Sequence, residues 1–533
     1  MKATDVFIQC LENEGVEYIF GIPGKETLDL VDSISRSGIK FINVRHEQGA
    51  AFMADVYGRL SNHVGVCLAT LGPGATNLVT GLASATLDHS PVVAIVGQAA
   101  TTRQHKESHQ FLNIKKLMEP VTKWSVEVKD STTIPEIIRR AFQLAANEKP
   151  GTVVVELPED IATCATPPVV LSVTQSPETM PIIKDLEKAY SLIQQSQKPF
   201  IVVGNGAIRQ EAVKELKAFI ERMQCPVTHS FKAKGILPKD HPLNYYTFGF
   251  QEKDEVVRGM AEADLLIVIG FDFIERLPQN WNIAKVPIIH IDALTAQVDE
   301  YYPVQLELVG DLKHTLNHLN TFDDLATPWV PTKNLKMQIE QIYHIDWNHV
   351  HLSSLTTENI LHVIEKLSCE RTIVISDVGT HKLSIARTYQ PKEPNQLIIS
   401  NGLASMGIAI PGSIGAKLAC PDAPVICITG DGGALTNFAE IETATRLGLS
   451  LIIIVLNDST LKLEQQMMEQ AFGNSHGVTF GNPDFVQLAQ SFGVKGVQAN
   501  DLSQFEEILT LHLKSPDGIV LIDVPLSPSN KMP

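Results

Sequence analysis

The chain has 533 residues, of which 44% are hydrophobic and 19% charged, and its formal net charge at pH 7 is −17. This length exceeds one ordinary hydrophobic core, so we expect about three domains in a globular protein. The acidic balance, without any basic stripe, argues against a nucleic-acid-binding protein.

The seven cysteines are scattered and form no C-x-x-C pair, which argues against a zinc site or a disulfide framework and suits a reducing compartment. The first 20 residues place acidic side chains inside their apolar pattern, unlike a signal peptide. Residues 65–87 carry few charges, but glycine, proline and asparagine interrupt them, so no membrane span is predicted. We expect a cytoplasmic protein without a membrane partner.

The first part of the chain alternates between helical and strand patterns, with a helix expected in 1–20. After the strand expected at 41–44, Arg45-His46-Glu47-Gln48 leads into a helix. Glu47 therefore falls in a first helical turn at the carboxyl end of a strand. On spacing alone, Glu47 could simply be an acidic partner for the helix dipole. The other strands are expected at 18–20, 66–70, 92–96 and 152–156.

Gly72-Pro73-Gly74-Ala75-Thr76-Asn77 follows the third of these strands and opens a helix rich in small residues. Close packing of that helix on a sheet would by itself explain such a composition. His109 and Gln110 lie on a polar connection after the fourth strand, where side chains are most often solvated. A stretch rich in threonine, proline and serine at 161–186 reads as a linker.

The middle of the chain has strand patterns at 199–203, 265–269 and 288–291, which again indicate an α/β domain. Gly204-Asn205-Gly206 follows the first of them, but Arg209 stands where a dinucleotide fingerprint has its third glycine. No acidic residue lies at the place expected for ribose binding. We therefore expect a structural domain without flavin, followed by a second linker around 322–356.

In the last third, a strand at 372–376 leads to Asp377-Val378-Gly379-Thr380-His381, which is either an ordinary polar loop or a phosphate-binding turn. A strand at 398–400 leads through Asn401-Gly402 to Met406. Methionine commonly fills gaps in a core, and that reading of Met406 stays open.

A strand at 425–429 ends in Gly430-Asp431-Gly432-Gly433, and a second strand at 449–456 ends at Asn457-Asp458. The single helix expected between them would have Asn437 as its N-cap. Parallel strands bind ligands at their carboxyl ends, so Asp431 and Asp458 should lie together. Two carboxylates beside a glycine turn suited to an anion are best reconciled by a hard cation such as Mg²⁺ bridging them to a diphosphate.

GDG followed by one helix, one strand and N-D-S-T resembles the metal–diphosphate signature of thiamin diphosphate enzymes. Within them the chain is most similar, along nearly its whole length, to acetolactate synthases of the catabolic, FAD-independent type. The resemblance implies an α/β fold of three domains with mainly parallel sheets. Two thiamin diphosphate-binding domains, 1–170 for the pyrimidine and 355–533 for the diphosphate and metal, would flank a Rossmann-like middle domain at 186–325.

The resemblance also implies roles for individual residues. Glu47 would hydrogen-bond the pyrimidine ring of the cofactor and promote proton removal from the thiazolium carbon, and Gln110 and His109 would lie near the substrate. Met406 would wedge the two cofactor rings, and the Gly402 carbonyl would accept from the amino group. The implied cofactor-binding residues are Pro73, Asn77, Gly379, Thr380, His381, Gly402, Met406, Gly432 and Gly433. Asp431, Asp458 and Thr460 would hold Mg²⁺.

The activity implied is decarboxylation of pyruvate on thiamin diphosphate, followed by attack of the resulting enamine on a second 2-oxoacid to give 2-acetolactate. A homodimer or homotetramer is implied, with Glu47 and Asp431 of one site on different chains. Two alternatives stay open: a 2-oxoacid decarboxylase without carboligation, and a thiamin diphosphate-binding regulatory protein without turnover. Catabolic relatives often carry tyrosine where Leu461 stands and have a longer tail, so the segment covering the site is expected to differ.

Overall fold

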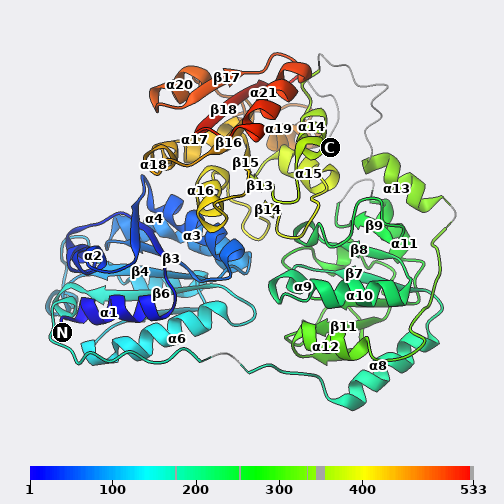
Figure 1. The fold of residues 1–533 in the computed structure, drawn as a ribbon, viewed down its shortest axis with the longest axis horizontal. Coiled ribbons are helices and arrows are strands. Elements are labelled where there is room, and N and C mark those ends of the chain that lie inside the picture. Colours follow the sequence, from blue (N-terminus) through cyan, green and yellow to red (C-terminus); the bar gives the residue numbers. More distant parts are fainter. Residues whose placement is uncertain (175–176, 251–253, 333, 344–353, 528–533) are drawn as a thin grey trace.

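The computed structural model describes residues 1–174, 177–250, 254–332, 334–343 and 354–527. Within these ranges the strands form three sheets, each of six parallel strands (Figure 1). The predicted α/β architecture with three parallel sheets is confirmed. No helix in the described ranges is both long enough and apolar enough to cross a membrane.

The N-terminal sheet has the order β2-β1-β3-β4-β6-β5. Its central strands β3, β4 and β6 are buried along their whole length because helices cover both faces of the sheet, as parallel sheets require. The strands are β1 (Tyr18–Gly21), β2 (Lys40–Asn43), β3 (Gly65–Ala69), β4 (Val92–Gln98), β5 (Trp124–Glu127) and β6 (Thr152–Pro158). The helices are α1 (Ala3–Asn13), α2 (Leu28–Ser35), α3 (Glu47–Ser61), α4 (Pro73–Leu87), α5 (Ile114–Met118), α6 (Ile134–Ala146) and α7 (Glu159–Ala162).

The middle sheet has the order β12-β11-β10-β7-β8-β9. A Cβ atom on Gly204 would lie 2.3 Å from the carbonyl oxygen of Gly270, so this glycine serves the close approach of two strand ends. The strands are β7 (Pro199–Val203), β8 (Val227–His229), β9 (Asn244–Thr247), β10 (Leu265–Ile269), β11 (Ile288–Asp292) and β12 (Val304–Val309). The helices are α8 (Ile183–Gln195), α9 (Gly206–Arg209), α10 (Val213–Met223), α11 (Glu255–Met260), α12 (Leu312–Leu319) and α13 (Leu335–Tyr343).

The C-terminal sheet has the order β14-β13-β15-β16-β18-β17, the same pattern of strand succession as the N-terminal sheet. The strands are β13 (Ile373–Ser376), β14 (Leu397–Ile399), β15 (Val425–Gly430), β16 (Leu451–Asn457), β17 (Lys495–Gln498) and β18 (Ile519–Pro525). The helices are α14 (Thr357–Leu367), α15 (Thr380–Thr388), α16 (Ala409–Ala419), α17 (Asp431–Thr436), α18 (Glu440–Arg446), α19 (Lys462–Phe472), α20 (Phe485–Ser491) and α21 (Leu502–Lys514).

The helix predicted after the GDG turn is present as α18, but the predictions that Asn437 caps it and that it is the only helix in this stretch are wrong. Two short helices, α17 and α18, occupy the stretch, and Asn437 is the C-terminal residue next to α17. Its side-chain Nδ2 donates to the carbonyl oxygen of Gly407 at 2.8 Å. A tertiary hydrogen bond to another loop therefore outweighs the local capping preference of asparagine.

The N-terminal and C-terminal domains share one hydrophobic core, in which α3 packs against α16 (Figure 1). The helices approach so closely that a Cβ atom on Gly415 would lie 2.3 Å from the carbonyl oxygen of Met53. Interiors this dense transmit small displacements. Helix α3, which begins at Glu47, is thus packed directly on α16, which begins three residues after Met406.

Candidate functional site

Asp431 is the first residue of α17 and is 3% exposed. Its Oδ1 accepts from the backbone N–H of Gly432 at 2.7 Å. Its Oδ2 accepts from the backbone N–H groups of Ser459 at 2.6 Å and Asp458 at 3.1 Å. The GDG turn and the loop after β16 are therefore joined through one carboxylate, at the carboxyl edge of neighbouring parallel strands.

Asp458 is half-buried beside this carboxylate. Burial, and then the charge of Asp431, raise the pKa of Asp458 above its ordinary value. The Thr460 hydroxyl donates to the Asp458 carbonyl at 3.1 Å, and the Thr460 backbone N–H donates to the Asp458 carboxylate at 3.2 Å. Two acids this near each other are destabilised unless a cation joins them.

Asn482 belongs to the same cluster, although the sequence analysis did not select it. Its Nδ2 lies 2.7 Å from Asp431 Oδ2 and 2.9 Å from Asn457 Oδ1, while its buried Oδ1 has no hydrogen-bond partner among the described residues. The Gly481-Asn482-Pro483 stretch signals only a turn in the sequence. Its return to the GDG turn is a tertiary contact, which local pattern does not predict.

A cavity of about 320 Å³ opens beside these residues. Two glycines in its wall leave no room for a side chain. A Cβ atom on Gly379 would lie 2.9 Å from the His381 ring, and one on Gly433 would lie 2.9 Å from the Asp377 carboxylate. The cavity brings together Gly379, Thr380, His381, Met406, Gly432, Gly433, Asp431, Asp458 and Thr460 from the predicted set, and Leu461 lines it too.

These residues fit a diphosphate carried with a cation. His381 is buried, its Nε2 has no hydrogen-bond partner among the described residues, and burial lowers its pKa to about 4, so it is neutral at pH 7. No group of three or more His, Cys, Asp or Glu side chains in the described part of the chain is arranged to hold a metal ion. Magnesium at Asp431 and Asp458 would therefore need further oxygen ligands, which a diphosphate supplies.

The second part of the predicted site lies in the N-terminal domain. Glu47 begins α3 after β2 and is 7% exposed, and the Asn77 side chain on α4 donates to Glu47 Oε2 at 2.9 Å. His46 caps α3, because its Nδ1 accepts from the backbone N–H of Gln48 at 3.1 Å. Pro73 is the first residue of the helix that carries Asn77. The strand ends thus place a carboxylate and an amide in contact.

The remaining predicted residues lie elsewhere. His109 and Gln110 are exposed, and Gln110 has a φ of +59°. A Cβ atom on Gly72 would lie 2.9 Å from the Gln110 carbonyl oxygen, so this loop runs against the turn before Pro73. Gly402 of the C-terminal domain donates its backbone N–H to Asp88 of the N-terminal domain at 3.1 Å, so it lies where these two domains meet. The residues lining the Asp431 cavity include neither Gly402 nor Glu47, Pro73, Asn77, His109 or Gln110.

Glu440 connects the C-terminal domain to the residues just before Glu47. This buried residue of α18 accepts at Oε1 from the backbone N–H groups of Arg45 and His46, each at 3.0 Å. Burial raises the pKa of Glu440 above its ordinary value. The approach to Glu47 is thus held by the C-terminal domain, a contact between residues nearly 400 positions apart that no local pattern predicts.

Three family models match successive parts of the chain. Residues 1–117 match the thiamine pyrophosphate enzyme N-terminal TPP binding domain, 186–319 the central domain, and 377–524 the C-terminal TPP binding domain.

Curated relatives extend along the whole chain. An acetolactate synthase of Bacillus subtilis (strain 168) is 33% identical, covering 100% of this chain and 94% of the relative. An acetolactate synthase large subunit of Buchnera aphidicola subsp. Acyrthosiphon pisum is 32% identical over 99% of this chain and 95% of its own length. A probable acetolactate synthase large subunit of Methanocaldococcus jannaschii is 33% identical over 100% and 93%. The chain therefore belongs to the thiamin diphosphate-dependent enzymes and is similar throughout to their acetolactate synthases.

Proposed function

We propose that this protein is an acetolactate synthase-like carboligase, which decarboxylates pyruvate and joins the two-carbon unit to a second 2-oxoacid to give 2-acetolactate. The observation that carries the proposal is the presence in one chain of both required parts. These are the Asp431–Asp458 pair on a glycine-lined cavity and the buried Glu47–Asn77 contact. The names of the full-length relatives support the choice of reaction.

In this proposal the Asp431 and Asp458 carboxylates and Thr460 hold Mg²⁺. Gly432, Gly433 and the turn formed by Gly379, Thr380 and His381 surround the diphosphate. His381 offers a neutral imidazole whose Nε2 is unpaired among the described residues. Met406 is 38% exposed on the cavity wall, which leaves its side chain free to contact a bound ring.

Thiamin diphosphate, when bound, would supply a nucleophilic thiazolium carbon for the keto carbon of pyruvate and an electron sink for the bonding pair left behind when carbon dioxide departs. Glu47 holds and returns a proton at the pyrimidine ring, which is general acid–base catalysis by a buried carboxylate. Asn77 orients that carboxylate through its hydrogen bond to Oε2. Gln110 and His109, on the exposed loop beside Pro73, would meet the substrate.

We further propose a homodimer, alone or within a homotetramer, in which Glu47 of one protomer faces the Asp431 cavity of its partner. The support is that no residue of the N-terminal domain lines that cavity within the described chain.

We propose the domain boundaries 1–170, 186–325 and 355–533. They are supported by the three sheets, which span 18–158, 199–309 and 373–525. Residues 344–353 and 528–533 lie outside the described ranges. A cytoplasmic location is proposed from the unpaired cysteines.

We propose that the reaction needs no flavin. The carboxyl edge of the middle sheet, where α/β folds bind nucleotides, carries an ion-paired cluster of the chain's own charged groups. Arg209 is ion-paired with Asp272 at 2.7 Å, and Lys149 reaches the same carboxylate at 2.6 Å. Stoichiometric flavin in the purified protein, with activity lost on its removal, would contradict this point.

Incubation with pyruvate, thiamin diphosphate and Mg²⁺ tests the proposed function. We expect pyruvate consumption and carbon dioxide release that require both cofactors and stop on chelation. Absence of pyruvate turnover with both cofactors bound would favour a non-catalytic binding protein or another 2-oxoacid, and acetaldehyde as the main product would favour a decarboxylase.

A further inference from the structure

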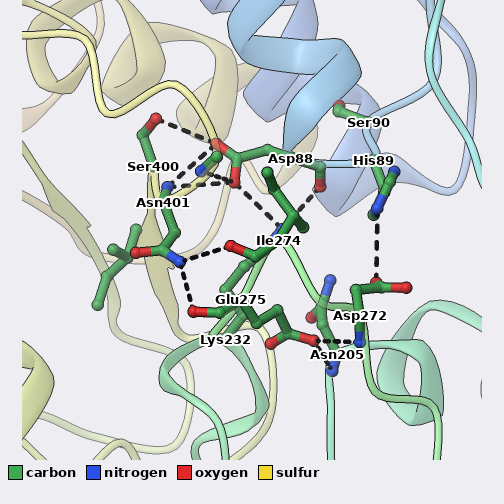
Figure 2. Close-up of polar contacts among 12 residues, drawn as sticks. Asp88, His89, Ser90, Asn205, Lys232, Asp272, Ile274, Glu275, Ser400 and Asn401 are labelled. Carbon is green, nitrogen blue, oxygen red and sulfur yellow. Dashed lines mark hydrogen bonds and ion pairs between the residues drawn. The ribbon is translucent and has the colours of Figure 1, made fainter. Parts of the chain in front are cut away.

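The carboxylate of Asp88 links all three domains. Asp88 follows α4 in the N-terminal domain, and its side chain is fully buried. Its Oδ1 accepts from the backbone N–H groups of Asn401 and Gly402, each at 3.1 Å, and its Oδ2 accepts from the Ser400 hydroxyl at 3.0 Å (Figure 2). One side chain thus receives three donors from the start of a single C-terminal segment.

Two cations complete this environment. The Arg59 guanidinium of α3 lies 3.2 Å from Asp88 Oδ2, and Lys232 of the middle domain lies 3.3 Å from Oδ1. Burial alone would raise the pKa of Asp88, but Lys232, Arg59 and the two backbone N–H groups together hold it well below its ordinary value. Asp88 is therefore ionised, and the hydrogen-bond donors and the two cations around it stabilise its negative charge.

The segment that Asp88 anchors runs from the end of β14 to the cavity wall. Its far end is also anchored, because Gly407 donates its backbone N–H to Asp377 Oδ1 at 2.8 Å. Between the anchors Ala404 has a φ of +55°, a conformation that costs energy for a residue with a Cβ atom. Such strain persists only where the surroundings hold it. Met406 and Ala404 both line the Asp431 cavity.

We propose that Asp88 is a positioning residue for the cofactor site. By holding the backbone at Asn401 and Gly402, it sets where Met406 stands on the cavity wall, although Asp88 itself does not line that cavity. The proposal rests on the proposed function, since it assumes that this cavity receives thiamin diphosphate. Lys232 extends the same anchor to the middle domain, so the position of that domain is coupled to the Met406 segment.

The substitution Asp88→Asn tests this role. Both carboxylate oxygens of Asp88 accept hydrogen bonds, but an asparagine amide has only one oxygen. Its NH₂ group would therefore face donors that it cannot pair with. We expect the Kd for thiamin diphosphate at fixed Mg²⁺ to rise about 10- to 100-fold, the range known for residues that orient ligand-binding groups. Backbone hydrogen exchange at Asn401 and Gly402 should accelerate in the same variant.

Glu14→Gln is the matched control. Glu14 is a largely buried acid of the same domain, ion-paired with Arg139 and remote from the anchored segment. The Glu14→Gln substitution should lower the Tm without changing the Kd for thiamin diphosphate or the rate of backbone hydrogen exchange at Asn401. A milder variant, Ser400→Ala, removes one donor to Asp88 and should shift the Kd in the same direction by less. Ser400→Ala keeps the test decisive if Asp88→Asn does not fold.

Wild-type cofactor affinity and wild-type exchange in Asp88→Asn would overturn the proposal, as would an equal loss of affinity in Glu14→Gln. Failure of the proposed function is distinguishable. If the unaltered protein does not bind thiamin diphosphate, the proposed function falls. In that case the exchange rates at Asn401 and Gly402 still decide whether Asp88 anchors the segment.

Discussion

Asn77 donates its side-chain N–H to Glu47 Oε2 at 2.9 Å, joining two helices that begin at the carboxyl ends of β2 and β3. A buried carboxylate costs free energy unless it is hydrogen-bonded, and this contact supplies a donor without neutralising the charge. The carboxylate of Glu47 is therefore held in one orientation, which an acidic partner for a helix dipole does not require and the proposed acid–base role does.

Glu47→Gln should lower turnover of pyruvate by about 10²–10⁴-fold, the usual contribution of a positioned acid or base. Cofactor affinity should change far less, because the amide keeps the shape and can still accept from Asn77. Exchange of the thiazolium C2 proton, followed by NMR, measures the lost step directly. Glu136→Gln, an exposed acid on α6, is the control. Near-normal exchange in Glu47→Gln would reduce Glu47 to a structural role.

Asn482→Ala should weaken Mg²⁺ binding in the presence of thiamin diphosphate by about 10–100-fold, because the lost amide orients the carboxylate that we propose as a metal ligand. Its Nδ2 contacts Asp431 and Asn457 at the same time. Titration of activity and of cofactor fluorescence quenching with Mg²⁺ gives the affinity. Exposed Asn474→Ala is the control, and equal Mg²⁺ affinities in the two variants would remove Asn482 from the site.

Glu156 gives a pH-dependent prediction for folding stability. Burial raises its pKa from 4.5 to about 7. Between these values the folded protein binds this proton more tightly than the unfolded chain, so the free energy of unfolding falls as pH rises from about 4.5 to about 7. Glu156→Gln should leave stability nearly unchanged at pH 4.5 and raise it at pH 8, by about 1–3 kcal/mol. Urea unfolding at both pH values checks this, and a variant destabilised equally at both would refute it.

Much of the fold follows from local pattern, because buried parallel strands are continuous apolar runs. The strand expected at 199–203 matches β7, and the GDG turn and Asp458 meet as their spacing across one strand–helix–strand unit predicts. The sequence analysis missed β5, β8, β9, β12, β17 and β18. Of these, β5 is short and half-exposed at a sheet edge, with little apolar signal. The assigned roles of the site residues stay predictions, even where the cavity brings the residues together.

The missed residues share one physical reason. Asp88 and Glu440 accept hydrogen bonds from segments far along the chain, and Asn482 donates to one. Asn437 donates to the carbonyl of Gly407 instead of capping a helix. For Asp88, Glu440 and Asn437 the partner is a backbone group, which is independent of residue type and therefore leaves no signal in a single sequence. For Asn482 the partners are side chains, but local pattern does not show that its turn folds back onto them.

Mixing two inactive variants tests whether the site is shared between chains. Glu47→Gln and Asp431→Asn protomers, unfolded and refolded together, should regain about a quarter of wild-type activity. Half of randomly formed dimers pair the two variants, and each such dimer has one intact site of two. Either variant refolded alone is the control. No recovery in a mixture that size-exclusion chromatography shows to be dimeric would place Glu47 and Asp431 in the same chain's site.

Product analysis with pyruvate as sole substrate, in the presence of thiamin diphosphate and Mg²⁺, tests the carboligase assignment most directly. Capture of the two-carbon unit by a second 2-oxoacid requires that water be kept from it, since protonation releases acetaldehyde. Leu461 lines the cavity, at the place where the resemblance to catabolic acetolactate synthases implies a tyrosine, so some acetaldehyde is expected. The account predicts 2-acetolactate, measured as acetoin after acid treatment, in clear excess over acetaldehyde, whereas acetaldehyde as the dominant product would contradict it.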